Sequence, residues 1–317
     1  MKVFVTGVAG QLGHDVMDEL YKRGYEGIGS DLAEAYQGIA DDSSVTHMSY
    51  VGLDITNAEQ VAQTLETIQP DVVVHCAAWT AVDAAEDEEN QEKVEDVNVK
   101  GTENIAKACA VIDAKMVYLS TDYVFDGQGK TPWQPDQTDY KPLNVYGKTK
   151  LAGEEAIRKY LTKYFIVRIA WVFGINGSNF IKTMLNVGKT HDEVRVVDDQ
   201  IGTPTYTYDL ARLLVDMIET ERYGPYHATN SELEQDNGCG TKVGYISWYD
   251  FTKEIYRQAG YTTKVTPVTT EEYGLSKAKR PFNSRLDKSK LIQKGFDPLP
   301  TWTDALSRYL KVLKVSK

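Results

Sequence analysis

Two ionisable side chains, Tyr146 and Lys150, stand four positions apart in the segment 144–150. On a helix, residues at this spacing project from the same face, so the phenol and the ammonium would lie side by side. A free tyrosine titrates near pH ~10, and an adjacent cation stabilises the phenolate and lowers that pKa. The pair is therefore predicted to act as an acid/base catalyst near neutral pH. The same spacing also arises by chance in a chain with 20 tyrosines, where it would mark only an amphipathic helix.

Three glycines, Gly7, Gly10 and Gly13, mark a turn near the start of the chain. They follow an apolar, β-branched segment, 2–6, which is typical of a strand buried on both faces, and they precede apolar residues at helical spacing. A strand, a tight turn and a helix together cradle a pyrophosphate, because glycine lets the backbone approach and the N–H groups at a helix start attract negative charge. With the tyrosine–lysine pair, this turn predicts a nucleotide-dependent oxidoreductase.

Asp31 follows a second short strand, residues 25–30, and lies within the ~20 residues expected after such a glycine turn. Its carboxylate is placed to accept hydrogen bonds from the adenosine ribose of a dinucleotide. A carboxylate at this place repels a 2′-phosphate, so we predict that NADH is favoured or at least tolerated, although nearby lysines could offset the preference. The alternative interpretation is a solvated loop aspartate.

Strands and helices alternate along the chain. This alternation predicts an α/β fold with a Rossmann-type doubly wound parallel sheet, whose ligands gather at the carboxyl ends of the strands. Two loops are predicted on the surface, at 32–50 and 231–244. The further strands are expected at 71–76, 115–120 and 164–170, and the helices at 57–68, 87–110 and 146–162.

The length of 317 residues and the 42% hydrophobic content suit one large α/β domain with a smaller partner. We expect an NAD(P)-binding Rossmann domain over 1–170, with returning segments at about 193–230. A smaller C-terminal substrate-binding domain would take 171–192 and 231–317.

Composition excludes several classes of protein. A net charge of −11 argues against a nucleic-acid surface, and no apolar run approaches the ~18 residues of a membrane span. The first predicted strand leaves no room for a signal peptide, and the odd set of Cys76, Cys109 and Cys239 lacks Cys-x-x-Cys spacing. We therefore expect a cytoplasmic protein with buried thiols. The histidines lack metal-ligand spacing, so no metal site is predicted.

Two strand ends and one basic cluster carry further candidate residues. Small residues at 77–80 would let a cofactor pass close to the backbone, and the hydroxyls of 120–123 would reach a substrate carbonyl. Thr121 could alternatively cap a turn. The basic cluster at 277–290 is either an ordinary charged face or a site for an anionic diphosphate.

Ordered blocks over nearly the whole chain resemble the dTDP-4-dehydrorhamnose reductase family, a group of extended short-chain dehydrogenases/reductases. The resemblance implies reduction of the C4 keto group of dTDP-4-dehydro-L-rhamnose by NADH or NADPH, giving dTDP-L-rhamnose for polysaccharide biosynthesis. The blocks lie at 7–13, 77–83, 120–127, 146–154, 171–174, 179–180, 199–205 and 280–284.

The resemblance also assigns roles by position. Tyr146 is the proton donor to the C4 oxygen, Lys150 binds the nicotinamide ribose and lowers the phenol pKa, and Thr121 hydrogen-bonds the same oxygen. Substrate contacts are expected from Asp122, Tyr123, Trp171, Asn179, Gln200 and Arg280, the last three toward the thymidine diphosphate. Cofactor contacts are expected from Gly7, Gly10, Gln11, Leu12, Gly13, Asp31, Asp54, Ile55, Ala77, Ala78, Thr80 and Lys150.

The chain departs from the family at one place. Some members carry three glutamates that hold magnesium across a dimer interface, and the corresponding positions here are Asp15, Tyr208 and Thr303. A hard cation needs several oxygen ligands, so we predict no bound magnesium and a monomer or weak homodimer.

Two alternatives remain at this stage. One is a nucleotide-binding regulatory subunit of the same fold that has lost turnover, and the other is an epimerase or dehydratase on another nucleotide sugar. The retained Thr121, Tyr146 and Lys150 favour catalysis. A dehydratase would usually need a second acidic residue beside Thr121 and Asp122.

Overall fold

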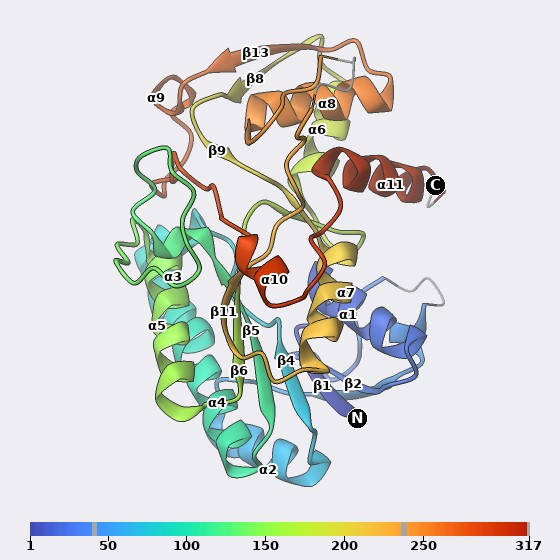
Figure 1. Ribbon diagram of the computed structural model, residues 1–317, viewed down its shortest axis with the longest axis vertical. Helices are drawn as coiled ribbons and strands as arrows, with labels where there is room; N and C mark the ends of the chain where they lie inside the picture. Colours follow the sequence, from blue (N-terminus) through green and yellow to red (C-terminus); the bar gives the residue numbers. More distant parts are fainter. Residues whose placement is uncertain (40–42, 236–239, 316–317) are drawn as a thin grey trace.

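The computed structural model describes residues 1–39, 43–235 and 240–315. Its centre is a sheet of seven parallel strands in the order β11-β6-β5-β4-β1-β2-β3, which is the doubly wound Rossmann order (Figure 1). The predicted fold class is confirmed. The strands span β1 (Lys2–Thr6), β2 (Glu26–Asp31), β3 (Ser49–Gly52), β4 (Val72–His75), β5 (Lys115–Thr121), β6 (Tyr164–Ile169) and β11 (Gly224–His227).

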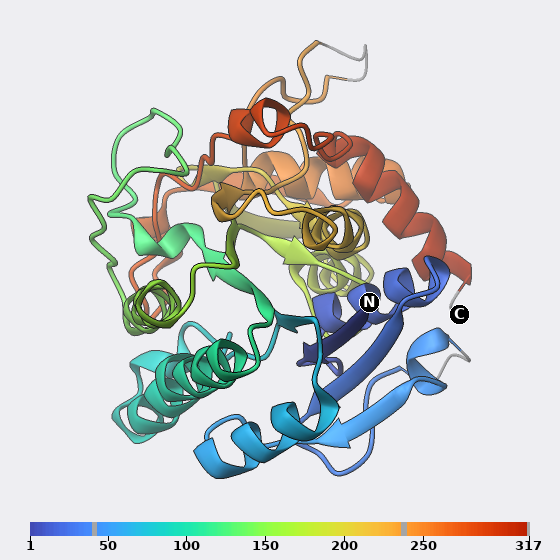
Figure 2. The same cartoon turned by 60° about the horizontal axis from the view of Figure 1, so that its bottom comes forward.

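Helices cover both faces of this sheet, which explains why its strands are almost continuously apolar. Successive side chains of a strand point to opposite faces. Val3 and Val5 therefore pack in one apolar cluster with helices α1 (Gln11–Lys22) and α7 (Thr207–Ile218). Phe4 packs in the other cluster, and the helices on the two faces can be followed in Figures 1 and 2. The helices of that second face are α2 (Ala58–Ile68), α4 (Thr102–Val111) and α5 (Val145–Tyr160).

A second group of elements lies above the sheet in Figure 1 and has its own aromatic core around Phe251 and Trp302. Its strand pairs are β7 with β10, β9 with β12 and β8 with β13. Its elements are β7 (Val172–Phe173), α6 (Phe180–Gly188), β8 (Glu193–Val197), β9 (Ile201–Gly202), β10 (Thr205–Tyr206), β12 (Ile246–Ser247), α8 (Trp248–Ala259), β13 (Lys264–Val268), α9 (Thr270–Tyr273) and α11 (Trp302–Val315).

We expected the chain to return to the large sheet over about 193–230. In the structure, it returns only from α7 onward. Strand β8 pairs with β13 in the second group, and α7 and β11 are the elements that rejoin the sheet. The sheet's apolar cluster also takes Leu291 of helix α10 (Ser289–Gln293), from the range expected for the smaller domain. Hydrophobic spacing alone did not reveal these pairings.

The structure differs in detail from the loop predicted at 32–50 and from the helix predicted at 87–110. The loop predicted at 32–50 ends in strand β3, and its residues 40–42 lie outside the described part of the chain. Residues 236–239 of the second predicted loop also lie outside it. The helix predicted at 87–110 is divided into α3 (Glu88–Glu95), a π-helical turn η3 (Asp96–Gly101) and α4.

Of the three cysteines, Cys109 is buried and Cys76 is half-buried, and both are free thiols. Cys239 lies outside the described residues. Within the described ranges, no helix has the length and apolar character needed to cross a membrane.

A fully buried ion pair connects α5 to the centre of the sheet. Glu154 accepts hydrogen bonds from Arg168 Nε and Nη2 at 2.8 Å each, from Ser120 Oγ at 2.5 Å and from Arg158 Nη2 at 2.7 Å. Burial alone would raise the pKa of Glu154, but the two arginines overcome it and hold that pKa below its usual value. The network therefore fixes α5 against β5 and β6.

We expect Glu154→Gln to lower the free energy of unfolding by about 3–5 kcal/mol, because the buried Arg168 guanidinium would lose its counter-charge. Since the folded pKa of Glu154 is lowered, its contribution is present above the ordinary value of 4.5 and is lost as the pH falls below it. Denaturant unfolding at pH 7 and pH 4 measures both effects. The control is Glu155→Gln on the exposed face of the same helix, which should change stability by less than about 0.5 kcal/mol. Equal stabilities of the two variants at pH 7 would contradict this account.

Candidate active site

A cleft of about 1040 Å³ opens at the carboxyl ends of β1, β4 and β5, where Thr6, Cys76 and Thr121 line it. Parallel strands place their carboxyl ends on one edge of a sheet, so segments far apart in the chain meet here. Every cofactor residue expected from the sequence lines this cleft. The catalytic and substrate candidates that also line it are Thr121, Tyr146, Lys150, Asp122, Tyr123, Trp171 and Arg280.

Tyr146 sits in the first turn of α5, next to the turn that follows β5. The helix begins at Asn144, whose side-chain oxygen accepts a hydrogen bond from Gly147 N at 2.8 Å. Gly147 lets the two segments meet, because a Cβ there would lie 2.4 Å from the carbonyl oxygen of Tyr123. The rings of Tyr123 and Tyr146 pack edge to face at 5.7 Å and 80°.

Burial raises the pKa of Tyr146 above its usual value, and the charges of Asp122 and Tyr123 add to the rise, while a hydrogen bond with Thr121 opposes it. The lowering of this pKa by Lys150 stays a prediction, and the net shift of the Tyr146 pKa is upward. The reason is that the low-polarity surroundings penalise a phenolate more than the neighbouring groups stabilise it. The result keeps Tyr146 neutral at physiological pH, which is the form that can donate a proton.

Lys150 is buried, and its Nζ lies 4.1 Å from the ring centroid of Tyr118. Burial lowers the pKa of Lys150 to about 7, although Glu154 and Cys76 act in the opposite direction. The ammonium and the neutral amine are therefore both accessible near neutral pH.

Asp122 follows Thr121 directly, and its side chain is also buried. The Thr121 hydroxyl donates a hydrogen bond to Asp122 Oδ1 at 3.0 Å. Burial raises the pKa of Asp122 to about 6, while Ser284, Thr121 and the charge of Arg280 limit the rise. The cleft thus holds a second group that titrates close to neutrality.

The glycine turn has the shape of a dinucleotide cradle. Gly7 has φ +73°, and a Cβ there would lie 2.6 Å from the amide nitrogen of Ala77. A Cβ on Gly13 would lie 2.3 Å from the carbonyl oxygen of Gly7. Asp31 closes the cradle on the side predicted for the ribose, and its Oδ2 accepts a hydrogen bond from Ala9 N at 3.0 Å. These features fit NAD(P)H.

Asn98 positions the loop after β4, and the sequence reasoning missed it. Its Oδ1 accepts a hydrogen bond from Trp79 N at 2.8 Å, and its Nδ2 donates to Trp79 O at 3.2 Å and to Thr149 Oγ1 at 3.1 Å. Asn98 belongs to the π-helical turn η3, a feature that often marks functional sites. No sequence signal identified it, because it stands inside the stretch predicted as one continuous helix at 87–110.

An aromatic pair forms one wall of the cleft. The rings of Trp171 and Trp248 stack at 3.8 Å with an interplanar angle of 20°, and both residues line the cleft. Trp171 has φ +52°, a left-handed conformation that is uncommon for a bulky residue and is found mostly at functional sites. Trp248 was not predicted, because it lies far from Trp171 in the sequence and the two side chains come into contact only in the folded chain.

Two of the predicted substrate residues, Asn179 and Gln200, are not among the described residues that line the cleft. Asn179 caps α6 and donates through Nδ2 to Gln11 Oε1 at 3.0 Å and to Tyr309 Oη at 2.9 Å. Gln200 donates through Nε2 to Thr270 Oγ1 at 3.0 Å. Both amides therefore brace the protein around the cleft.

The positions considered for magnesium have other partners. Asp15 is buried and accepts a hydrogen bond from Thr207 Oγ1 at 2.5 Å, and Tyr208 lies under Lys22, whose Nζ is 5.1 Å from the ring centroid. Thr303 shares a hydroxyl contact of 3.1 Å with Thr301. In the described part of the chain, no group of three or more His, Cys, Asp or Glu residues could hold a metal ion. The expected absence of magnesium stays a prediction, as does the assembly state.

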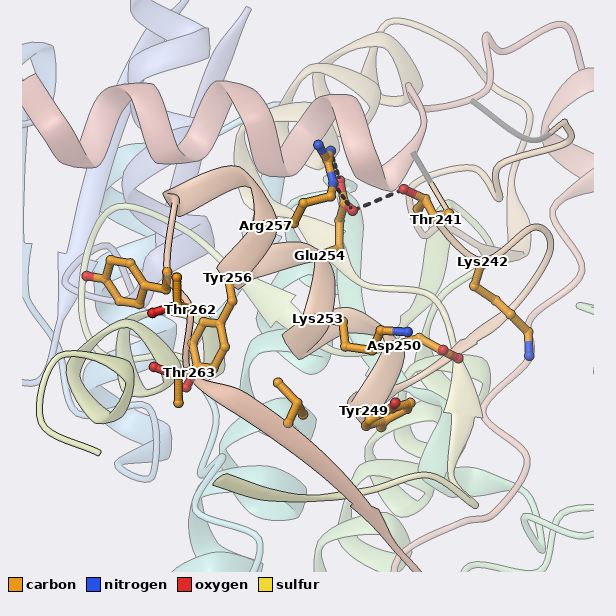
Figure 3. A pocket seen from close by; sticks show the side chains of 13 residues that line it. Thr241, Lys242, Tyr249, Asp250, Lys253, Glu254, Tyr256, Arg257, Thr262 and Thr263 are labelled. Atoms are coloured by element: carbon orange, nitrogen blue, oxygen red, sulfur yellow. Dashed lines mark hydrogen bonds and ion pairs between the residues drawn. The ribbon is translucent and has the colours of Figure 1, made fainter. Parts of the chain in front are cut away.

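A second pocket of about 400 Å³ lies on helix α8, apart from the large cleft (Figure 3). Its Glu254 is bound by Arg257 and Thr241, and its Asp250 closes the cap of the helix with Ser247. None of the site residues predicted from the sequence is among the described residues that line it.

Comparison with known proteins identifies the family of the chain. Residues 1–315 match the family model described as "RmlD substrate binding domain". The chain belongs to this family. The spore coat polysaccharide biosynthesis protein SpsK of Bacillus subtilis (strain 168) is 39% identical over 98% of this chain and 97% of its own length.

Two solved members of the family resemble the chain over nearly its whole length. A dTDP-4-dehydrorhamnose reductase from Clostridium acetobutylicum ATCC 824 has 40% identity and a TM-score of 0.86, covering 99% of this chain and 100% of its own. The enzyme of that name from Bacillus anthracis str. Ames, in complex with NADP, has 37% identity and a TM-score of 0.84, covering 98% and 100%. The resemblance to the reductase family seen in the sequence is confirmed.

We expect Asp31→Asn to shift the cofactor preference toward NADPH. Removing the carboxylate removes a repulsion against a 2′-phosphate, so the ratio of kcat/KM for NADPH to that for NADH should rise about tenfold. Initial rates with each cofactor at saturating sugar measure it. Glu34→Gln, which removes an exposed charge from the same loop, is the control. A ratio that moves equally in both variants would show that Asp31 has no specific role.

Proposed function

We propose that this protein reduces the C4 keto group of dTDP-4-dehydro-L-rhamnose with NADH or NADPH, giving dTDP-L-rhamnose. The observation that carries the proposal is the meeting of Thr121, Tyr146 and Lys150 in the cleft that also contains the glycine cradle. Two family members that resemble this chain over nearly its full length bear the name of this reductase.

The residues of the chain have distinct tasks in this reaction. NAD(P)H supplies the hydride when bound in the cradle of Gly7 and Gly13. Tyr146, held neutral by burial, donates its proton to the oxygen of the former C4 carbonyl. The Thr121 hydroxyl hydrogen-bonds the same oxygen, and the charged form of Lys150 stabilises the phenolate left behind.

The sugar would lie between the catalytic residues and the aromatic wall. Trp171 and Trp248 offer a flat apolar surface to a sugar ring. Asp122, Tyr123 and Arg280 line the same cleft and present polar groups to the substrate hydroxyls. Asp122 is buried and the other four side chains are half-buried, so a bound sugar would displace water from this part of the cleft.

The wider cellular setting is also part of the proposal. The unpaired thiols of Cys76 and Cys109 suit a reducing, cytoplasmic environment. The acidic surface of a chain with net charge −11 suits a small-molecule substrate with no nucleic-acid partner. A monomer or weak homodimer is the expected assembly.

The direct test follows the oxidation of NADH and NADPH at 340 nm with dTDP-4-dehydro-L-rhamnose. The proposal expects oxidation that depends on both the sugar and the protein, with dTDP-L-rhamnose as the product. Tight cofactor binding without oxidation of any keto-sugar would instead support a regulatory subunit of the same fold. Release of a different sugar would favour an epimerase or another reductase.

We expect Tyr146→Phe to lower kcat by about 10²-fold or more, because the proton donor is removed while the ring remains. The affinity for NADPH should stay within about twofold, which fluorescence titration measures. Tyr160→Phe, at the other end of helix α5, is the matched control and should keep normal turnover. Near-normal turnover of the Tyr146 variant would exclude it as the proton donor.

A further inference from the structure

A segment of the chain between α9 and α10 passes from the upper group of elements down to the sheet (Figure 1). We call residues 277–287 the strap. Its backbone is bonded to both sides: Asn283 N donates to Gly127 O at 2.8 Å, and Ser284 N donates to Ile201 O at 2.8 Å. The strap therefore ties the two groups together beside the cleft.

Asp83 holds the strap from the cofactor side. It stands at the end of the loop that follows β4, the same loop whose residues line the cofactor part of the cleft. Its Oδ1 accepts a hydrogen bond from Ala278 N at 3.0 Å, and its Oδ2 accepts one from Arg280 Nη2. One carboxylate thus fixes both the backbone and the guanidinium of the strap.

Arg280 connects Asp83 to Tyr123, which packs against Tyr146. Its Nη1 donates a hydrogen bond to the Tyr123 hydroxyl at 3.1 Å, and the Tyr123 ring packs edge to face on Tyr146 at 5.7 Å. Arg280 is about a quarter exposed, with 23% of its side chain accessible, so this contact is made at the inner wall of the cleft. A continuous line of contacts runs from Asp83 through Arg280 and Tyr123 to Tyr146.

We propose that Asp83 is a positioning residue for the reduction, which fixes the Tyr146 phenol against the bound sugar through Arg280 and Tyr123. This inference rests on the proposed function. The carboxylate of Asp83 is 42% exposed, and ion pairs this open to water add little to stability. Its contribution is therefore geometric: it fixes a flexible arginine, and the arginine fixes the tyrosine pair.

The test compares Asp83→Asn with a matched control at Asp87, which also binds a residue of the strap. Asp87→Asn removes a carboxylate, 35% exposed, that pairs with Lys277 at 2.7 Å and lies apart from the line of contacts. We expect Asp83→Asn to lower kcat about tenfold, since small misplacements of a catalytic group cost up to about 10²-fold. The dissociation constants for dTDP and NADPH, measured by calorimetry, should stay within about twofold, and Asp87→Asn should keep the wild-type kcat.

A second variant tests the line of contacts itself. Arg280→Lys keeps the charge but loses the fork that reaches Asp83 and Tyr123 together. It should lower kcat as Asp83→Asn does, and the double variant should be no slower than either single one, because both changes break the same line.

The outcomes separate the two proposals. If the wild type reduces the sugar and Asp83→Asn matches Asp87→Asn in kcat, Asp83 has no positioning role. If Asp83→Asn loses dTDP binding and thermal stability together with kcat, its role is structural and the inference is also overturned. If the wild type does not reduce the sugar at all, the proposed function fails and this inference fails with it.

Discussion

Glu154 is a fully buried carboxylate that accepts hydrogen bonds from two arginines and a serine, which lie on three different elements. A charge in such surroundings is tolerated only with complete pairing, so the positions of α5, β5 and β6 are mutually fixed. Tyr146 and Lys150 lie on α5, and Thr121 ends β5. The relative positions of these three residues therefore depend on an ion pair that is not part of the described lining of the cleft.

Burial also decides the protonation states in the cleft. The same desolvation that raises the pKa of Tyr146 lowers that of Lys150 and raises that of Asp122. A reductase needs a protonated donor, so a raised phenol pKa suits reduction at neutral pH. In the proposed reaction, the lysine would contribute most after proton transfer, when its positive charge can stabilise the phenolate.

The cleft is closed by parts of the chain that lie far apart in sequence. Trp248 begins α8 and stacks on Trp171, while Arg280 reaches the cleft from the strap. Asn179 and Gln200 brace this region from outside the described lining. One side of the cleft is thus lined by loops that follow the strands of the sheet, while Trp248 and Arg280 reach it from segments outside the sheet.

The sequence alone determined the strand–turn–helix at Gly7–Gly13, the alternation of strands and helices and the tyrosine–lysine spacing, because each is a short-range pattern. Only the tertiary structure decided the direction of the Tyr146 pKa shift, the pairing of β8 with β13, and the roles of Asn98 and Trp248. Those features depend on which distant segments meet and on how much water they exclude. Neither quantity is encoded in the local spacing of residues, since both arise when the whole chain packs.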